Sequence, residues 1–370
     1  MNASTWKLRP RGIATVCALE LRQRVRSIKW YVALGIWFLF HAGIALLAFG
    51  GVAFLAGSLD GEVVYRTAAV VFTISTILTV FALVMVLPAV SAGSINGDRN
   101  AGTLATLQAS LLSPFEIAVG KVLAGWVLGL AFIALAVPVF GLTGLLSGAS
   151  VFYLARLIIA MAVVALFVVL LGMGFSAVTK RQLGSVVLTY IVVLGVTVIA
   201  PVVYLMTLPL VSFESRVTVY EQSTYPDTSD DSTSAYVYEC EERVETRVVP
   251  RTDLALPLLL VNPVVMVADQ SPPLEDVFIG GTDGQRIDGL QLIRTGIRHL
   301  AQPMHPSHFN SCGAYGDEGG PPRDFGQPTG IPVWPLGFAA WGAVAAGALV
   351  LTTLRLRAPM RTLLPGQRIA

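Results

Sequence analysis

The sequence predicts an all-α polytopic membrane protein with six transmembrane helices, cytoplasmic N- and C-termini, and a mainly β or irregular extracellular domain between helices 5 and 6. The composition is the first observation: of 370 residues, 54% are hydrophobic and 13% are charged, with a mean hydropathy of +0.70. Soluble domains carry about 25% charged residues. The second observation is six apolar runs of membrane-spanning length, and the third is the placement of Lys and Arg in alternate connections.

The six apolar runs each reach the roughly 20 residues that a helix needs to cross the hydrocarbon core. They are residues 30–56, 67–92, 122–146, 157–178, 185–211 and 333–354. The chain therefore divides into a tail with an interfacial helix (1–29), helices 1–5 (30–211), an extracellular domain (212–332), helix 6 (333–354) and a basic tail (355–370). Pro88, Pro138 and Pro201 fall inside runs, where neighbouring helices can satisfy the backbone groups that proline leaves free.

Lys and Arg near the run ends indicate the orientation, because they are retained on the cytoplasmic side. The basic residues on one side are Lys7, Arg9, Arg11, Arg22, Arg24, Arg26, Lys29, Arg99, Lys121, Lys180, Arg181, Arg355, Arg357, Arg361 and Arg368. On the other side, the first loop offers only Arg66 and the loop after the third run has no charge. We therefore expect a multi-pass protein of the cell (plasma) membrane with both ends and the loop 93–121 in the cytoplasm. No basic patch of the nucleic-acid-binding kind is present, so no nucleic-acid partner is expected.

The segment before the first run has apolar residues at helical spacing between basic ones. These are Ile13, Cys17, Leu21, Val25 and Ile28. The pattern predicts an amphipathic helix that lies in the headgroup layer of the lipid bilayer. The alternative is a basic tail that only sets the topology.

A seventh apolar segment, residues 254–269, is short for a crossing and contains Pro257 and Pro263. If it crossed the membrane, the basic C-terminal tail would lie outside the cell, against the positive-inside bias. We therefore predict a re-entrant or interface-lying segment.

The first run contains His41, for which we expect a hydrogen-bonded packing role rather than a functional one.

The extracellular domain begins with an acidic, strand-like region. Residues 215–220 and 235–238 alternate as strands do, and the stretch TYPDTSDDSTS between them predicts a hairpin tip. Cys240 and Cys312 are the only cysteines in this domain, and an oxidising exterior favours a disulfide between them, with two free thiols as the alternative. No metal site is expected, because the histidines near Cys312 lie in Gly- and Pro-rich chain without fixed spacing.

The loop 93–121 reads from residue 94 as SINGDRNAGTLATLQASLLSPFEIAVGK. Asp98 is expected to cap a short amphipathic helix with Leu104 and Leu107 on its apolar face. Ser113 and Glu116 then form a predicted capping box with Pro114 at the first helical position. The helix that starts there runs on through Lys121 into the third run, so the loop predicts a short helix held against the base of a membrane span. The alternative is a loop that simply links two helices.

At these residues the sequence resembles the permease subunits of ABC exporters of the type-2 class. Those proteins carry an Arg-x-x-Gly-Thr-Leu element between spans two and three, followed by a Leu-rich stretch, a Ser-Pro pair and a Gly-Lys pair. The matching residues here are Arg99, Gly102, Thr103, Leu104, Leu111, Leu112, Ser113, Pro114, Gly120 and Lys121, with the usual acidic residue at Asp98. Ala105 stands where the family often has Glu.

The resemblance implies a transport subunit rather than an enzyme. Two such subunits, identical or related, would dock on two ABC ATPase subunits that bind ATP and Mg²⁺, and this chain contains no GxxxxGK[ST] phosphate loop of its own. The ATPase-coupling residues would be Asp98, Arg99, Gly102, Thr103, Leu104, Leu107, Ser113, Pro114, Glu116 and Lys121. The cargo is not identified, and the sparse charge in the spans favours a lipophilic one. The alternatives are a membrane-anchored sensor or assembly protein with an extracellular binding domain, and, less favoured, a membrane enzyme.

Overall fold

A computed structural model describes residues 5–57, 60–104, 107, 112–226, 236–273, 288–301, 308–310 and 332–357. Six helical segments in it are long and apolar enough to cross a membrane, and they coincide with the six predicted runs. They are α2 (Ile28–Ala56), α3 (Gly61–Ser91), α6 (Pro114–Leu146), α7 (Val151–Val178), the span that begins with α8 (Gln182–Leu194), and α14 (Trp334–Arg355). The predicted number and positions of the spans are confirmed by length and composition.

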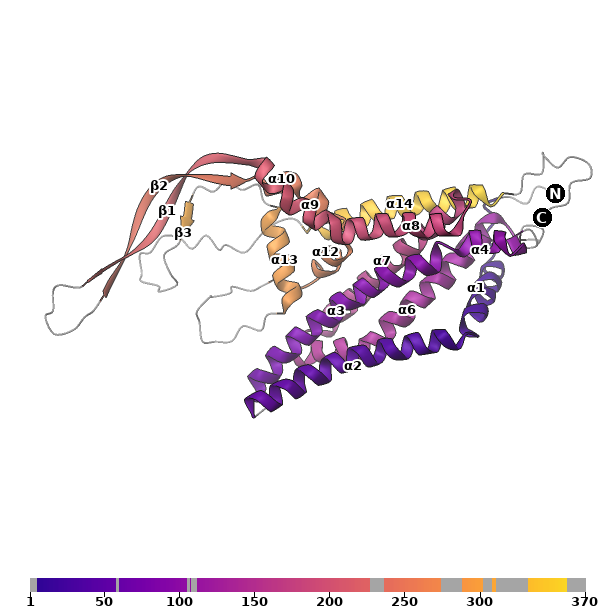
Figure 1. Cartoon of the computed structure of the whole chain (residues 1–370), viewed down its shortest axis with the longest axis horizontal. Helices are drawn as coiled ribbons and strands as arrows, with labels where there is room; N and C mark the ends of the chain where they lie inside the picture. The colour runs from indigo at the N-terminus through magenta and orange to yellow at the C-terminus, as the bar shows by residue number, and fades with distance from the viewer. Residues whose placement is uncertain are drawn as a thin grey trace, which may run out of the picture.

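The six spans form one bundle with two different ends (Figure 1). Helices α1 (Pro10–Val25) and α4 (Ser94–Asn100) lie at one end, called here the α4 end, where α14 also finishes. Helix α13 (Gly289–Leu300) and the β-strands lie at the other, called here the α13 end. The core is built mainly by α3, α6 and α7, whereas α2 has the smallest buried share of the six spans. The apolar surface of α2 is what a lipid-facing helix requires.

The fifth span is irregular around Pro201. The helix α8 passes into a π-helical turn, η1 (Gly195–Ile199), and continues as α9 (Ala200–Thr207) and a 3-10 turn, η2 (Leu208–Val211). Proline has no N–H for the carbonyl four residues earlier, which here belongs to Thr197. The side chain of Asn262 donates its Nδ2 to that carbonyl at 3.0 Å. A neighbouring segment therefore satisfies the freed backbone group, as the sequence predicted for prolines inside spans.

The apolar segment that contains Asn262 consists of three short helices rather than one span. These are α10 (Thr252–Ala255), α11 (Pro257–Leu260) and α12 (Pro263–Ala268). Met266 and Ala268 are fully buried in the main core, and Trp341 of α14 donates its indole N–H to the carbonyl of Val261 at 2.8 Å. The segment packs on the α13 end of the bundle, and no helix of spanning length is found within it. Whether it re-enters the membrane stays a prediction.

Asp269 follows α12 and joins three elements at the α13 end. Its carboxylate is fully buried, lies 2.6 Å from Nε of Arg298 on α13, and is 4.0 Å from Nε of Arg294. Its second oxygen accepts the backbone N–H groups of Val333 and Trp334 at 2.8 and 2.9 Å. The start of α14 is thereby capped by an acidic side chain, which helix N-termini favour.

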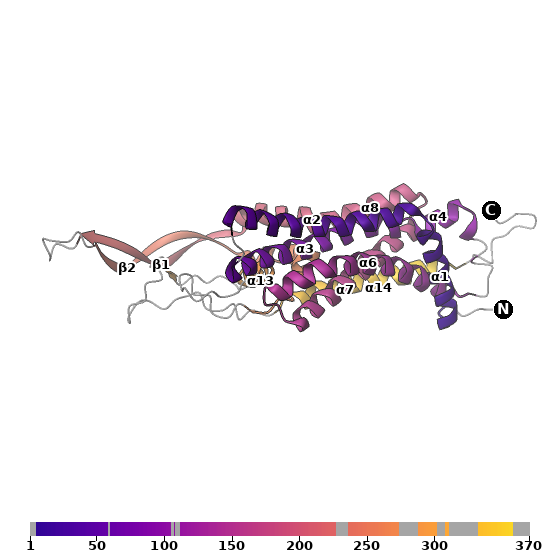
Figure 2. The same cartoon turned by 90° about the horizontal axis from the view of Figure 1, so that it is seen from below.

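A long antiparallel ribbon projects from the α13 end (Figures 1 and 2). Strand β1 (Ser212–Pro226) pairs along its whole length with β2 (Tyr236–Pro250), and the short strand β3 (His308–Asn310) adds to β1 in parallel. Both predicted strands are confirmed in position but are longer than the alternation indicated. The first three residues of the predicted hairpin tip, 224–226, belong to β1, and the rest of it lies outside the described residues. Cys312 and the side chain of Cys240 also lie outside them, so the disulfide stays a prediction.

His41 of α2 is buried, as expected, but the hydrogen bond expected of it is not present. Neither ring nitrogen has a partner. The ring instead packs edge-on against Trp37, with centroids 4.3 Å apart. Aromatic packing therefore takes the place of the expected polar contact.

Candidate functional site

The candidate site is the short helix α4 and the turn that follows it, at the α4 end of the bundle. Gly102, just beyond the last residues of α4, has a φ of 72°, a left-handed conformation that costs glycine no side-chain clash. The expectation that Asp98 caps a helix is wrong, because α4 begins at Ser94 and Asp98 lies inside it. The reason is tertiary: the carboxylate of Asp98 is engaged by Lys121 of α6.

Lys121 is the centre of a buried cluster of four charges. Its side chain is 1% exposed, its Nζ lies 2.5 Å from Oδ2 of Asp98, and it forms a second ion pair with Oε1 of Glu20 on α1. Arg24, one turn further along α1, lies 3.7 Å from the other oxygen of Glu20. Two cations therefore face two carboxylates. Because a buried charge without its partner is strongly destabilising, this cluster fixes α1 and α4 against α6.

Arg24 lies outside the membrane-spanning segments, and its guanidinium is largely removed from solvent. Desolvation lowers the pKa of its guanidinium from the ordinary value, and the nearby carboxylate of Glu20 opposes that change. The desolvated cation is therefore only partly compensated by its neighbour.

The capping box predicted at the start of α6 is present. The N–H of Glu116 donates to Oγ of Ser113 at 3.1 Å, and the N–H of Ser113 donates to Oε2 of Glu116 at 2.8 Å. Pro114 occupies the first helical position. The structure adds contacts that the motif did not predict: Arg9 donates to Oε1 of Glu116 at 3.0 Å, and Oγ of Ser113 donates to the carbonyl of Lys7 at 2.6 Å.

Polar contacts also tie α4 to the connection between α7 and α8. Asn96 is fully buried; its N–H donates to Oγ of Ser176, and its Nδ2 donates to Oγ1 of Thr179 at 3.0 Å. Ser185 of α8 donates its hydroxyl to the carbonyl of Ala92 at 2.6 Å. Each of these groups is satisfied by a different element, so α4 is fixed relative to the fourth and fifth spans as well as to the third.

Helix α1 lies across the α4 end and touches α6 at a glycine (Figure 2). A Cβ added to Gly120 would lie 2.6 Å from Cβ of Val16 and 3.1 Å from the carbonyl oxygen of Ile13. No side chain other than hydrogen fits at that distance, so Gly120 permits the close approach of the two helices. The resemblance pointed to this glycine, but the residue that it contacts was not predicted.

The helical prediction for α1 is confirmed. The face that packs on the protein was not predicted, and Val16 and Glu20 are its buried positions. The apolar residues Ile13, Cys17 and Leu21 line a groove beside Leu123. Glu20 is tolerated on the protein-facing side of α1 because it forms an ion pair with Lys121. Insertion of α1 in the headgroup layer stays a prediction.

The predicted coupling residues divide into two groups. Arg99, Gly102 and Thr103 are exposed and form what we call the tip of the loop, whereas Leu104 is buried in the core and Leu107 packs against it. The remaining five belong to the internal frame that supports the tip: Asp98, Ser113, Pro114, Glu116 and Lys121. Leu111 and Ala105 lie outside the described residues. Among the predicted coupling residues that the structure describes, only Arg99 and Thr103 therefore offer exposed side chains to a partner.

Sequence reasoning missed Glu20, Arg24 and Asn96. A signal for the first was available, because Glu20 is the only acidic residue among the first 59. Similarly, Asp98 and Glu116 are the only acidic residues between positions 63 and 213. An isolated acid in such apolar chain is expected to have a buried cationic partner. No comparable signal singles out Asn96.

The contacts described at this site are ion pairs, hydrogen bonds and one close approach of two helices. In the described ranges no group of three or more His, Cys, Asp or Glu side chains is placed to hold a metal ion.

Comparison with known proteins adds no family to these observations: no family model matches the chain, and no curated protein matches it either.

Proposed function

We propose that this chain is the membrane-spanning permease subunit of an ABC exporter, and that it couples ATP hydrolysis by a separate ATPase subunit to export of an unidentified substrate. The sparse charge in the spans favours a lipophilic one. The observation that carries the proposal is the support of the exposed tip by a buried frame. Lys121, Asn96 and Glu116 each connect that frame to a different part of the bundle. A partner that moves the tip would therefore move membrane helices.

The transmission path follows from the contacts. A force on Arg99 or Thr103 acts on α4, and the ion pair between Asp98 and Lys121 passes it to α6. The contacts of Asn96 pass it to the connection between α7 and α8. Buried polar contacts transmit small displacements because a close-packed interior shifts between discrete arrangements and does not deform continuously.

The proposed assembly contains two copies of an ATPase subunit and a second permease subunit, identical or related. ATP and Mg²⁺ would bind to the ATPase subunits, and this chain would not be an enzyme. The apolar faces of α2 and α8, which carry exposed side chains such as Leu47 and Ile191, would be covered by lipid or by the second permease subunit. The cytoplasmic location of the α4 end rests on the positive-inside bias.

The test is a site-specific crosslink from the tip. A photoreactive amino acid is placed at position 103 in the full-length chain, in its native membrane, and the captured chain is assayed for ATP hydrolysis. Arg181 is the matched control position, because it is also exposed at the α4 end but lies outside the tip. We expect capture of an ATP-hydrolysing chain from position 103 and much less from position 181.

A second experiment tests the coupling itself by reversing the charge of single residues. Arg99→Glu, but not Arg181→Glu, should uncouple ATP hydrolysis from transport while membrane insertion stays normal. Labelling of position 103 only from outside the cell, or equal effects of the two reversals, would contradict the proposal.

One observation supports the alternative function of a sensor or assembly protein. The ribbon of β1 and β2 has 15 residues in each strand and projects from the α13 end. A long exposed ribbon can bind a partner by strand addition. Removal of residues 214–248 distinguishes the two: a permease retains stimulated ATP hydrolysis by its partner, whereas a sensor loses its function.

A further inference from the structure

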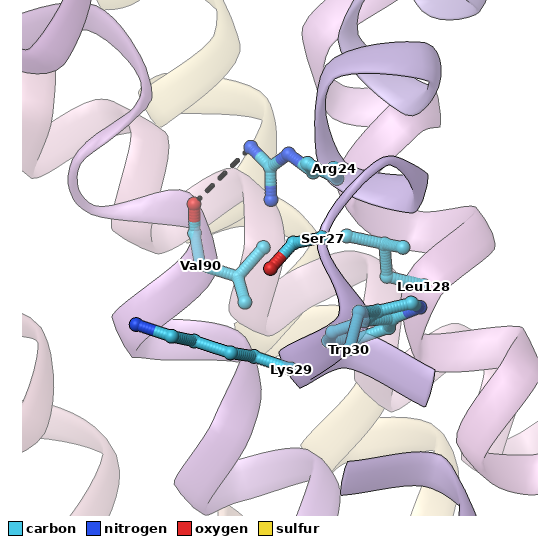
Figure 3. Close-up of a pocket in the computed structure, with 6 residues that line it drawn as sticks. All are labelled: Arg24, Ser27, Lys29, Trp30, Val90 and Leu128. Atoms are coloured by element: carbon cyan, nitrogen blue, oxygen red, sulfur yellow. Dashed lines mark hydrogen bonds between the residues drawn. The ribbon is translucent and has the colours of Figure 1, made fainter. Parts of the chain in front are cut away.

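A pocket of about 270 Å³ lies at the elbow between α1 and α2. It is lined by Arg24, Ser27, Lys29, Trp30, Val90 and Leu128 (Figure 3). The lining comes from four helices and one turn that meet there, namely α1, the turn after it, and the spans α2, α3 and α6. The pocket is separate from the exposed tip of the loop and takes no part in the proposed coupling contacts.

The polar side chains of the pocket are all donors. Figure 3 shows the hydroxyl of Ser27 between the guanidinium of Arg24 and the side chain of Lys29. With the residues that the structure describes, the guanidinium makes two contacts, both long: 3.4 Å to the carbonyl of Val90 and 3.7 Å to Glu20. A guanidinium carries five N–H donors, so most of its donors remain available. Glu20 is shared with Lys121 and therefore does not fully compensate Arg24.

The height of the pocket in the membrane follows from its neighbours. It lies where the amphipathic helix α1 meets the first span, and the aromatic pair Trp30 and Tyr31 stands at the start of that span. Tryptophan and tyrosine concentrate at the level of the lipid headgroups. Apolar walls from Val90 and Leu128 adjoin the cations, so the site suits a ligand that has an anionic head on an apolar stem.

We propose that this pocket binds the phosphate of an anionic phospholipid from the leaflet at the α4 end. Arg24 and Ser27 donate hydrogen bonds to the phosphate oxygens, and Lys29 contributes charge at the rim. Basic pockets between membrane helices on the cytoplasmic side bind anionic headgroups in this way. Because Arg24 also contacts Glu20 of the buried charge cluster, a bound headgroup would sit one residue away from the frame that supports α4.

The experiment uses the full-length chain in detergent and measures lipid binding by native mass spectrometry. The probes are phosphatidylglycerol, phosphatidylcholine and inorganic phosphate. The test variants are Lys29→Gln and Arg24→Gln, and the matched control is Arg26→Gln, which removes the same charge from an exposed residue outside the pocket. Lys29→Gln keeps the test valid if Arg24→Gln disturbs folding through Glu20.

We expect phosphatidylglycerol to bind more tightly than phosphatidylcholine, and each test variant to weaken it roughly five-fold, the effect of one basic residue near an anionic surface. Arg26→Gln should change the affinity little, and inorganic phosphate should not compete. Equal binding of the two lipids would show no preference for an anionic headgroup, and an equal loss in Arg26→Gln would show only a general attraction of α1 to anionic surfaces. Either result would overturn the proposal. Effective competition by inorganic phosphate would overturn it in favour of a soluble anion.

Discussion

The two ends of the bundle are both held by a buried ionic centre, but the centres have opposite charge. At the α4 end, the cation Lys121 lies between the carboxylates of Glu20 and Asp98. At the α13 end, the carboxylate of Asp269 lies between two arginines and also accepts two backbone N–H groups of the start of α14. The first centre joins three helices mainly through side chains, with one long contact of 3.4 Å from Lys121 to the carbonyl of Ser94, whereas the second caps the start of a helix through two backbone N–H groups.

This difference indicates different mechanical roles. A lysine ammonium is a compact charge on a flexible stem and can keep its ion pairs while the helices that carry them shift. A carboxylate that caps a helix N-terminus is fixed by the geometry of two neighbouring N–H groups. We therefore infer that the junction beneath the proposed coupling loop can shift together with its helices while its ion pairs stay intact, and that the opposite end is anchored through the main chain.

The largest effect is expected from Asp269→Ala, which removes the acceptor for Arg298 and for the start of α14. The expected loss is about 3–5 kcal/mol of unfolding free energy, as for one partner of a buried ion pair. Thermal and denaturant unfolding of the purified chain in detergent measures it. Asp253→Ala is the control, because Asp253 pairs with the half-exposed Arg251 at 2.8 Å and should cost no more than about 1 kcal/mol. Equal losses of unfolding free energy in the two variants would show that Asp269 contributes no more than an exposed ion pair, and would contradict the prediction.

Lys121→Met is expected to rank second, with a loss of about 3 kcal/mol, because it leaves Glu20 and Asp98 facing each other without their common cation. The same unfolding assay applies. Neutralising all three residues, with Glu20→Gln and Asp98→Asn added, should recover a large part of the loss. If the triple variant is as unstable as Lys121→Met alone, the cluster does not act through charge balance.

Arg9→Gln should have a smaller effect, about 1 kcal/mol, because the Arg9 side chain is 44% exposed and its ion pair with Glu116 is partly screened by solvent. The capping box survives in this variant, since Ser113 still bonds Glu116 in both directions. The difference from wild type should shrink as salt is raised. A loss that is large and independent of salt would place Arg9 in the buried frame instead.

Asp288→Asn tests a second carboxylate at the α13 end and should have the smallest effect. Burial raises the pKa of the Asp288 carboxyl above its ordinary value, so its charged form costs stability above that pKa and the cost disappears as the pH falls. Asparagine caps helices as well as aspartate does. The variant should therefore equal or exceed wild type in unfolding midpoint at neutral pH, and the gap should close in acid. A variant that is less stable than wild type at neutral pH and equally stable in acid would show that the charged carboxylate stabilises the fold, which contradicts the prediction.

Much of the fold was predictable because hydrophobic runs and proline positions act locally. The six spans, the helix of residues 10–25, the capping box of Ser113 and Glu116, and the position of the ribbon all follow from short-range pattern. The expectation that Asp98 caps a helix failed because a distant residue, Lys121, binds its carboxylate. The burial of Glu20 on α1, which pairs with the same lysine, was not predicted for the same reason.

The candidate site was predictable as a stretch of chain but not as a set of roles. The resemblance grouped Arg99, Thr103 and Lys121 together, whereas the structure exposes the first two and buries the third. The contacts of Asn96 with Ser176 and Thr179 join residues about eighty positions apart in the sequence, and no local pattern predicts them.

The sequence by itself determined how many helices this chain places across a membrane and which connections are rich in basic residues, because the cost of exposing backbone and charge to lipid acts on each segment independently. Only the tertiary structure decided which charges meet in the interior, since a buried ion pair depends on the approach of helices far apart in the chain. Lys121 with Glu20 and Asp269 with Arg298 are the two cases on which the ends of this bundle depend.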